Sequence, residues 1–582
     1  MVLFIAAVSA LLVSGVLYWT STDSHLTQRL NQFERSVVAA SAATEKVVAH
    51  IARDFQSGGE MAVSNNLSTY RGLVPTPTEV LAAAGAPDDG VWGNYEFTDP
   101  QQQINRTYVE RVTDWRYTNL QTKLPGMTGY AARYRIIANA RELGAGSSPV
   151  SAVQQEVQLA SLPVFQFQIL YGLDLEINPL QSMAIPGRVH CNGTIYSQPA
   201  EALTFQNHVT ASRKILNQKH PDDPVSRTLG TITYQGGHES GVNVLTLPIG
   251  TNRGPAALHA LLEIPPASES RDSPLGRQRY YNKADMVILI SNKVGVAKSG
   301  AYNNFSVTIP WTNIADYLVV KRRRISRWKW SYVTNYYDGV LDTNSTFFNI
   351  RENKTVQATE FDVSQLLTNY SKITSYLGRN PKTIYIADMR TQSASTQSGI
   401  RLISGDTLPS PGLTLVTPNP LYVQGDYNVP VSYLGTTNTS GSVPASLVGD
   451  AITILSDRWP DIDGTYKLQF RTATNTTINA ALLGGIVPTR GGYYSGGVEN
   501  FPRLLEDWTD YTLTLNGSMV ALFESQIATA PWGANPDVYA PPVRQWAFDP
   551  NFLDPARLPP STPELRTLFR VNWQTVAANS TP

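Results

Sequence analysis

A run of basic and aromatic residues between positions 321 and 330 is the most unusual local feature of the sequence. Six of these ten residues are basic and two are tryptophans. Cations beside flat aromatic rings bind phosphate groups and stack on sugars or bases. We therefore expect contact with an anionic surface polymer, without specific nucleic-acid recognition. The residues concerned are Lys321, Arg322, Arg323, Arg324, Arg327, Trp328, Lys329 and Trp330.

The same segment has a second interpretation as an ordinary strand. Its aromatic residues Trp328, Trp330 and Tyr332 alternate with Arg327, Lys329 and Ser331. A half-buried strand with a charged outer face produces this alternation too. The pattern alone leaves both interpretations open.

Paired carboxylates are the next candidates for chemistry, because glycoside cleavage uses two carboxyl groups at a defined separation. The pairs are Asp174 with Glu176, Asp222 with Asp223, and Glu506 with Asp507. Asp174 and Glu176 would share one face of a strand. Neighbours in sequence do not establish the separation that catalysis requires, and acids that are solvated or cap a strand ladder are the simpler interpretation. We expect no catalytic residue.

Metal and nucleophile signals are weak. Of the seven histidines, only His190 stands beside a cysteine, Cys191, and no metal-ligand spacing is present. Cys191 lies on the apolar face of an expected strand, so we predict a buried structural thiol. The string GHESG at residues 237–241 has serine in the wrong place for a nucleophile elbow. We expect no metal and no cofactor.

Residues 1–19 form an apolar segment without a charged side chain. It ends in Tyr18 and Trp19, residue types that concentrate at membrane interfaces. A helix of this length crosses the hydrocarbon core of a bilayer. A cleavable secretory signal needs a basic start, a shorter apolar run and a small-residue cleavage site. We therefore expect an anchor in the lipid bilayer through residues 1–19.

The helical pattern continues as an amphipathic stalk over residues 21–57, with apolar residues mostly three or four positions apart. The pair Gly58-Gly59 predicts its end. An uninterrupted helix to about Phe55 would span roughly 80 Å. A simple anchor followed by a linker helix has the same pattern. The residues expected to pack in the membrane or along the stalk are Leu11, Leu12, Leu17, Leu26, Leu30, Phe33 and Val37.

Length and composition predict a large, mainly β head. A chain of 582 residues exceeds the size at which one core stops growing, so two or more packed units are expected. The 46 basic and 46 acidic residues balance, which argues against a general attraction of the whole surface to nucleic acid or lipid. Abundant Gly, Pro, Tyr and Trp are typical of short strands joined by turns.

Short segments of alternating apolar residues recur in two regions of the head. In one of them Leu203, Phe205 and Val209 share a face. Stacked coils of this kind build a β-solenoid, which is the fold we expect, although a β-sandwich would show similar alternation. The sequence between the two regions mixes helix and strand patterns, and Asp362 or Ser364 would cap its helix.

The fold class predicted is mainly β with an α+β insertion, behind an N-terminal helix. The expected segments are a transmembrane helix (1–20), a stalk helix (21–57), the N-terminal part of the head (58–160), a first β-rich region (161–215), the inserted α+β region (216–400), a second β-rich region (401–530) and a Pro-rich C-terminal tail (531–582). Prolines favour an extended conformation for this tail.

Two families resemble parts of the chain. Residues 2–15 (VLFIAAVSALLVSG) and 26–45 (LTQRLNQFERSVVAASAATE) resemble the N-terminal segment of PilX-type pilus assembly proteins. That resemblance implies a pilin-like stem that inserts in the inner membrane and packs into a pilus or a pilus-initiating complex. The head, through residues 165–179, 187–196, 412–428 and 494–508, is similar to large uncharacterised envelope proteins of Gram-negative bacteria, which imply no known activity.

These observations together predict a non-enzymatic, pilin-like component of a type IV pilus or related pseudopilus. We expect a single-pass protein of the inner membrane with an extracytoplasmic head, whose partners are other pilin-like or pilus-assembly proteins. The alternative is a membrane-tethered scaffold or adhesin outside any fibre. A polysaccharide-acting β-solenoid enzyme is a more distant alternative, and it would require three or more acids in one groove.

Overall fold

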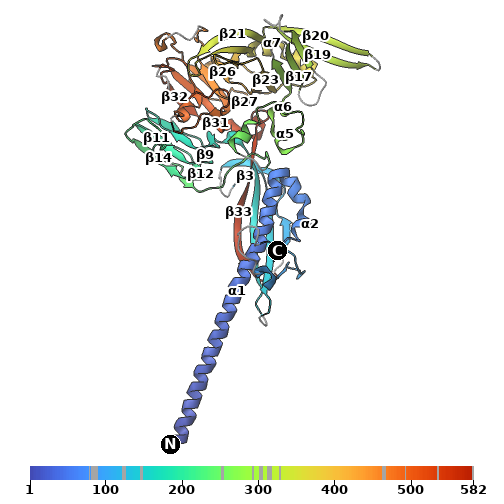
Figure 1. The fold of residues 1–582 in the computed structure, drawn as a ribbon, viewed down its shortest axis with the longest axis vertical. Helices are drawn as coiled ribbons and strands as arrows, with labels where there is room; N and C mark the ends of the chain where they lie inside the picture. The colour runs from blue at the N-terminus through green and yellow to red at the C-terminus, as the bar shows by residue number, and fades with distance from the viewer. Residues whose placement is uncertain are drawn as a thin grey trace. The chain divides into compact units, whose positions relative to one another are not determined.

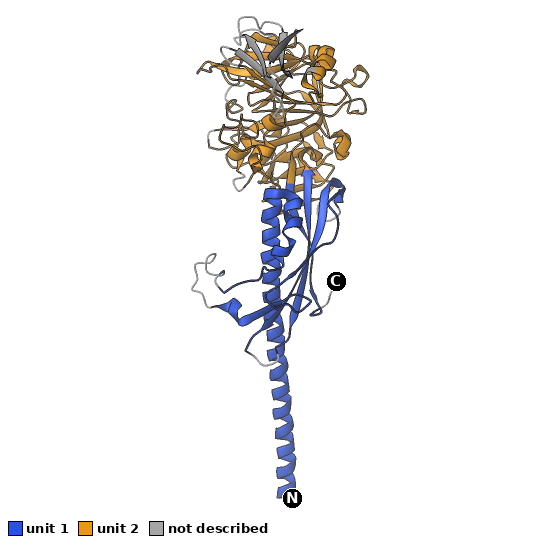
Figure 2. Ribbon diagram, turned by 90° about the vertical axis from the view of Figure 1, so that its right-hand side faces the viewer, with its two compact units in different colours: residues 1–162, 566–582 blue, residues 163–565 orange. Residues whose placement is uncertain are grey.

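The computed structural model divides the chain into two compact units (Figure 2). Unit 1 contains Met1–Leu162 and Arg566–Pro582, and unit 2 contains Pro163–Leu565. The structure describes all residues except 78, 80–89, 121–125, 145–147, 251–253, 291–293, 300–305, 311–316, 327–328, 462–466, 492, 534–536 and 580–582. For residues 2, 294–299, 306–310, 317–326, 329–338 and 376 it describes the backbone alone.

Unit 1 begins with one long helix, α1 (Val2–Asn65). The sequence predicts that the stalk ends at Gly58-Gly59, but the chain bends there and the helix resumes as far as Asn65. Gly59 has φ of 76°, a left-handed conformation that glycine adopts without the steric cost of a Cβ. The glycine therefore bends the helix instead of ending it. A short helix, α2 (Leu67–Tyr70), follows.

The rest of unit 1 is a six-stranded sheet in which β4 is central and pairs antiparallel with β1, β2, β3 and β5. Its strands are β1 (Tyr95–Thr98), β2 (Tyr108–Arg111), β3 (Arg116–Leu120), β4 (Met127–Glu142), β5 (Ser151–Pro163) and β33 (Glu564–Val576). The second half of α1 buries Val47, Ile51 and Phe55 in one cluster with residues of β4 and β5. The four-residue spacing of these side chains places them on one helix face.

Strand β33 differs from the sequence prediction of an extended C-terminal tail over residues 531–582. No proline occurs between Pro563 and Pro582, and from Glu564 to Phe569 exposed or half-buried residues alternate with buried ones. Such alternation suits an edge strand with one buried face. β33 therefore pairs with β5 in the sheet of unit 1.

Unit 2 opens with short parallel strands that stack in register. The pairs Ile169↔Val189 and Val189↔Val209 are each 20 residues apart, as are Leu175↔Ile195 and Ile195↔Ile215. The strands are β6 (Ile169–Tyr171), β7 (Leu175–Ile177), β8 (Met183–Ile185), β9 (Val189–Cys191), β10 (Ile195–Ser197), β11 (Ala202–Phe205), β12 (Val209–Ala211), β13 (Ile215–Leu216), β14 (Thr231–Tyr234) and β15 (His238–Ser240). Figure 1 marks β9, β11, β12 and β14.

A second stack follows, parallel except for the antiparallel pair β21–β22, and β31 of this stack pairs with β6 of the first. One of its sheets has the order β31-β29-β27-β25-β23-β16, and the other has the order β21-β22-β24-β26-β28-β30. The strands are β16 (Met286–Ile290), β21 (Leu341–Asn349), β22 (Lys354–Asp362), β23 (Thr383–Asp388), β24 (Thr396–Ile403), β25 (Leu413–Val416), β26 (Leu421–Gln424), β27 (Ala445–Gly449), β28 (Ile452–Leu455), β29 (Thr476–Ile486), β30 (Pro502–Arg503), β31 (Thr512–Glu524) and β32 (Val543–Ala547).

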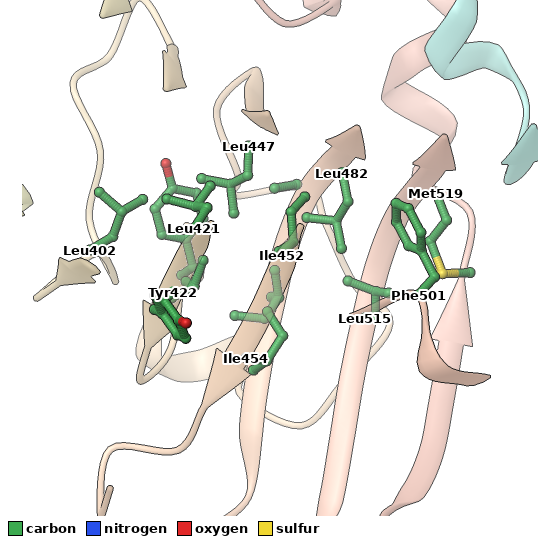
Figure 3. Packing of buried hydrophobic residues seen from close by; sticks show 14 of the residues in the cluster. Leu402, Leu421, Tyr422, Leu447, Ile452, Ile454, Leu482, Phe501, Leu515 and Met519 are labelled. Carbon is green, nitrogen blue, oxygen red and sulfur yellow. The ribbon is translucent and has the colours of Figure 1, made fainter. Parts of the chain in front are cut away.

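The core of unit 2 is a continuous apolar cluster between these sheets. Figure 3 shows Leu447 and Leu482 near Leu421 and Ile452, which come from the opposite sheet. All four side chains are buried, as are those of Leu515 and Met519 further along the stack. Because each coil covers the apolar face of the next, the cluster extends from one stack into the other.

The remaining elements of unit 2 include two hairpins and four short or medium helices. They are β17 (Val294–Ser299), β18 (Ser306–Pro310), β19 (Tyr317–Ser326), β20 (Lys329–Asp338), α4 (Pro255–His259), α5 (Pro274–Gln278), α6 (Tyr280–Lys283) and α7 (Val363–Leu377). The Asp362 side chain accepts a hydrogen bond from the backbone N–H of Gln365, so the predicted cap of α7 is confirmed at that residue. The predicted order of a long apolar helix followed by a mainly β head is also confirmed.

Candidate functional site

The first half of α1 is the clearest candidate site in unit 1. The side chain of Leu11 is 71% exposed and that of Leu17 is 64% exposed, in contrast to the buried second half of the helix. By length and composition the helix is able to cross a membrane. Of the residues predicted to pack in the membrane or along the stalk, six are exposed and Val37 is partly buried on the core of unit 1. The six are Leu11, Leu12, Leu17, Leu26, Leu30 and Phe33.

The change from exposed to buried along α1 has a clear chemical basis. No charged side chain precedes Asp23, and the apolar residues before it lie all around the helix. A helix that is apolar on every side is stable only where no water surrounds it. From Ala39 onward one face packs on the sheet, and Arg570 of β33 pairs with Glu45 of α1. The first half of α1 therefore has an exposed apolar surface, and its second half packs on the sheet of unit 1.

The predicted basic and aromatic site falls on the hairpin β19–β20. The two strands pair antiparallel, with Arg323 opposite Tyr332 and Ile325 opposite Trp330. Lys321 to Arg324 lie on β19, and Lys329 and Trp330 lie on β20. Arg327 and Trp328 lie outside the described residues. The register places Lys329 opposite Ser326, two residues beyond the basic run on β19, and contact of these residues with an anionic polymer stays a prediction.

Asp174 and Glu176 line one cavity of about 340 Å³ in unit 2. The Ser495 hydroxyl donates to Glu176 Oε1 at 2.8 Å, while Oε2 is buried without a partner in the described part of the chain. Burial raises the pKa of Glu176. Asp174 instead accepts the backbone N–H of Thr194, at 2.7 Å, from the next coil. Asp174 thus caps a strand ladder, whereas Glu176 is a buried acid facing a cavity.

The coil that bears these acids needs a glycine at residue 193. A Cβ built there would lie 2.1 Å from Asp174 Oδ1 and 2.8 Å from the backbone nitrogen of Asp174. Only glycine allows two successive coils to approach this closely.

The other predicted acid pairs do not line this cavity. Asp223 forms a buried ion pair with Arg227 at 2.7 Å. Glu506 accepts the backbone N–H of Ser456 at 2.7 Å, and burial raises its pKa to about 7. Asp507 accepts the backbone N–H of Thr509 at 3.1 Å. Among the described residues, the lining of this cavity includes two carboxylates, those of Asp174 and Glu176.

Glu499 is a buried acid that sequence reasoning missed. It lines a neighbouring cavity of about 410 Å³, and its Oε1 accepts the backbone N–H of Asn178 at 2.9 Å. Burial raises the pKa of Glu499 to about 7. Arg351, which lines the same cavity as Glu176, was also missed. No local pattern marks either residue, because both reach their partners through long-range packing.

His190 and Cys191 are structural. Both are buried, and the Cys191 thiol donates to the backbone carbonyl of Leu173 at 3.0 Å, so the predicted buried thiol is confirmed. Burial lowers the pKa of His190 to about 4, and its ring contacts Thr210 and Asn192. Among the described residues no group of three or more His, Cys, Asp or Glu side chains is arranged to hold a metal ion.

Comparison with known proteins gives little beyond the fold described above. No protein-family model and no curated protein matches the chain. Among solved structures, the chain is similar to the competence-associated pilin ComZ from Thermus thermophilus, with 10% identity over 94% of this chain and 97% of the other. The TM-score is 0.27, which is too low for this likeness to carry an argument.

Proposed function

We propose that the chain is a non-enzymatic, membrane-anchored, pilin-like component in the assembly or display of a type IV pilus or a related pseudopilus. The observation that carries this proposal is the division of α1 into an exposed apolar half and a half packed on an antiparallel sheet. The same helix thus has an apolar segment suited to lipid or to other apolar helices, followed by a segment that belongs to the core of unit 1.

The exposed half of α1 has the dimensions of a membrane anchor. Residues 1–19 in a helix measure about 29 Å at 1.5 Å per residue, close to the roughly 30 Å of a bilayer core. Tyr18 and Trp19 at the end of this stretch suit the interface with the lipid headgroups. A single pass with the head on the extracytoplasmic side of the inner membrane fits this arrangement.

The same apolar rod suits a fibre, because it can leave lipid only where other apolar helices cover it. Helices packed side by side in a fibre core provide such a cover, through close contacts between apolar side chains. The resemblance of residues 2–15 and 26–45 to PilX-type proteins supports pilin-like or pilus-assembly partners. A tethered scaffold would use the same anchor without this second step.

The head has features of a display domain. We interpret the parallel coils of unit 2, which repeat every 20 residues between β6 and β12, as a β-solenoid. In this proposal the hairpin β19–β20 carries the basic residues that contact an anionic surface polymer. Neither role requires catalysis.

Charged substitutions in α1 test the proposal. Leu11→Arg and Leu12→Arg place a cation in the centre of the apolar stretch, which costs about 2.5 kcal/mol or more in a bilayer. The protein should then shift from the alkali-resistant membrane fraction to the soluble fraction and disappear from sheared fibres. Gln28→Arg, at an exposed polar position of the same helix, is the matched control. If both leucine variants behave like this control, the apolar half of α1 is not the functional site.

A further inference from the structure

The cavity of about 410 Å³ beside Glu499 lies in unit 2, between residues 179–183 of the first stack and residues 541–544 at the start of β32. At Asn178 the two parts of the chain are in contact, because its backbone N–H donates to Glu499 Oε1 at 2.9 Å. Beyond β8 they are in contact again, since a Cβ built at Gly187 would lie 2.7 Å from the Cβ of Phe548. The cavity therefore has a closely packed frame.

Prolines explain why the backbone does not close this gap. Pro179, Pro541 and Pro542 line the cavity, and Pro186 follows β8 directly. Proline has no backbone N–H and cannot donate to a strand ladder. In keeping with this, β8 is the last strand in the sheet order β14-β11-β8, whereas β6 continues into β31 of the second stack.

Aromatic rings provide one wall of the cavity. The ring of Trp532 lies 5.5 Å from that of Tyr494 and 6.4 Å from that of Tyr539, in edge-to-face contacts. The tyrosine hydroxyls already have protein partners: Tyr539 donates to Asn500 Oδ1 at 2.8 Å, and Arg227 donates to the hydroxyl of Tyr494. The aliphatic part of the lining consists of Pro179, Leu180, Met183, Val225, Pro541, Pro542 and Val543. This lining is suited to an apolar group.

A cation stands beside the exposed edge of the apolar lining. Leu180 is 61% exposed and Val543 is 49% exposed, and the next residue in the chain is the half-buried Arg544. Arg544 donates to the backbone carbonyl of Glu499 at 3.2 Å and lies over the ring of Trp546. It forms no ion pair with a carboxylate in the described part of the chain. A guanidinium in this position favours a carboxylate, which it binds through charged hydrogen bonds.

The other charged groups of the lining are Arg227 and Glu499. Arg227 pairs with Asp223 at 2.7 Å. Burial raises the pKa of Glu499 to about 7, so this acid is largely protonated at pH 6. At that pH the charge of Arg544 is the one that the described lining leaves for a ligand.

We propose that this cavity binds a ligand with an apolar body and one terminal carboxylate, the body against Trp532 and the carboxylate on Arg544. The C-terminal residue of a peptide and a short fatty acid share this chemistry. The volume of about 410 Å³ lies within the roughly 300–1,000 Å³ typical of small-molecule sites. The site lies in unit 2, away from α1 in the chain, and goes beyond the proposed assembly role.

The test is calorimetric titration of the purified full chain at pH 6 in digitonin, a detergent without a linear alkyl chain. The probe is 3-phenylpropionate, its amide is the matched neutral probe, and acetate lacks the apolar body. We expect 3-phenylpropionate to bind at least tenfold more tightly than either, because the amide lacks the charged hydrogen bond and acetate lacks the apolar burial. Equal affinity for acid and amide, equal affinity for acid and acetate, or no binding at millimolar acid would overturn the proposal.

Two further probes distinguish the sources of such a ligand. Tighter binding of N-acetyl-glycyl-phenylalanine than of octanoate would indicate the C-terminus of a peptide, and the reverse order would indicate a fatty acid. Binding of either probe supports the site, whereas binding of neither would contradict it.

Variants locate the site. Arg544→Gln should weaken binding of 3-phenylpropionate tenfold or more and leave the weak binding of its amide unchanged. Trp532→Leu should weaken both, because it removes part of the aromatic wall. Arg490→Gln removes an exposed cation outside this lining, and as the control it should bind like the wild type. Unchanged affinity for the acid in a folded Arg544 or Trp532 variant would contradict the assignment.

None of these measurements depends on fibres. Failure of carboxylate binding would leave the proposed assembly role intact, and failure of the fibre experiments would leave the carboxylate site intact.

Discussion

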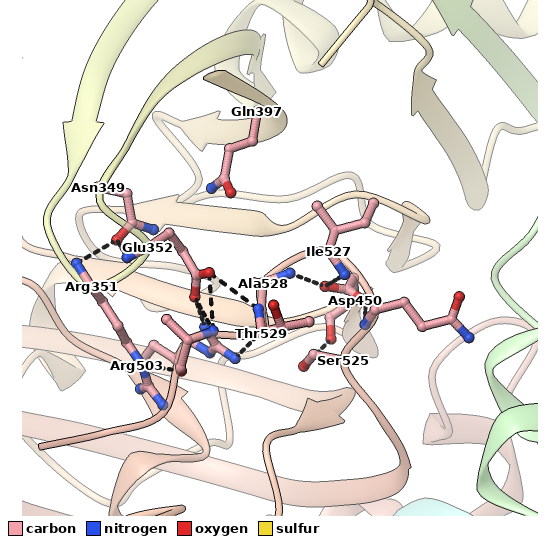
Figure 4. A network of polar contacts seen from close by, with 12 residues as sticks. Asn349, Arg351, Glu352, Gln397, Asp450, Arg503, Ser525, Ile527, Ala528 and Thr529 are labelled. Atoms are coloured by element: carbon pink, nitrogen blue, oxygen red, sulfur yellow. Dashed lines mark hydrogen bonds and ion pairs between the residues drawn. The ribbon is translucent and has the colours of Figure 1, made fainter. Parts of the chain in front are cut away.

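The buried ion pair between Glu352 and Arg503 gives the sharpest stability prediction. Glu352 receives Arg503 at 2.6 Å through Oε1, and the backbone N–H groups of Thr529 and Ala530, both at 3.1 Å, through Oε2. Figure 4 shows how these contacts hold the loop after β31. In Glu352→Gln the amide keeps the shape of the side chain but removes the charge that pairs with Arg503, and the cation of Arg351 lies close by.

The expected loss follows from breaking a buried pair on one side, which costs about 3–5 kcal/mol. With an unfolding entropy of roughly 2.1 cal/mol/K per residue, a unit of about 400 residues changes its Tm by roughly 1 °C per kcal/mol. We therefore expect the Tm of the full chain in detergent, followed by tryptophan fluorescence, to fall by about 3–5 °C.

Glu524→Gln is the matched control, because it removes an equal charge from a pair that is exposed. Arg490 and Glu524 lie 3.1 Å apart, with side chains 62% and 39% exposed. An exposed pair contributes about 0–1 kcal/mol, so the Tm should change by roughly 1 °C or less. Similar shifts in the two variants would refute the reasoning that burial sets the cost.

Three further predictions concern other parts of unit 2. Glu499→Gln should raise stability at pH 8 but not at pH 4. Burial raises the pKa of Glu499 from 4.5 in the unfolded chain to about 7 in the folded one, so between pH 4.5 and pH 7 the folded state binds more protons than the unfolded state. The wild-type protein therefore loses up to about 3 kcal/mol of folding free energy as the pH rises through this range. If the Tm of the wild type and the Tm of Glu499→Gln change by the same amount between pH 5 and pH 7, this effect is excluded. Ile195→Ala removes a fully buried side chain of one coil and should lower the free energy of unfolding by about 2–5 kcal/mol, seen as a lower denaturant midpoint. Lys214→Ala, at an exposed position of the next coil, is the control and should leave the midpoint almost unchanged. Asp362→Ala should cost about 0.5–2 kcal/mol by removing the cap of α7, and faster amide exchange limited to α7 would report it; exchange unchanged there would argue against the cap.

The parts of the fold that were predicted correctly depend on local sequence. The uncharged run before Asp23 indicates a helix by itself, and Asp362 caps the helix that begins at the next residue. The apolar face that includes Cys191 follows from the two-residue period of a strand. Each of these signals is contained within about twenty residues.

The parts that were missed depend on contacts between distant residues. The 20-residue coil is hard to see because its strands have three or four residues, and the next coil is longer, with Val209 opposite His238. Strand β33 finds its partner β5 some 400 residues earlier in the chain. Glu176 and Arg351 line one cavity although 175 positions separate them in the sequence. No local period encodes such pairings, since packing of the whole unit decides them.

The most direct test of the central claim is the location of the tagged wild-type protein in sheared surface fibres, together with the amount of fibre in a deletion strain and its complemented parent. We predict that deletion reduces the fibres, that complementation restores them, and that the tag is found in the sheared fraction as well as in the membrane. Normal fibres after deletion, with all of the tag in the membrane fraction, would contradict the pilus role and leave a tethered scaffold.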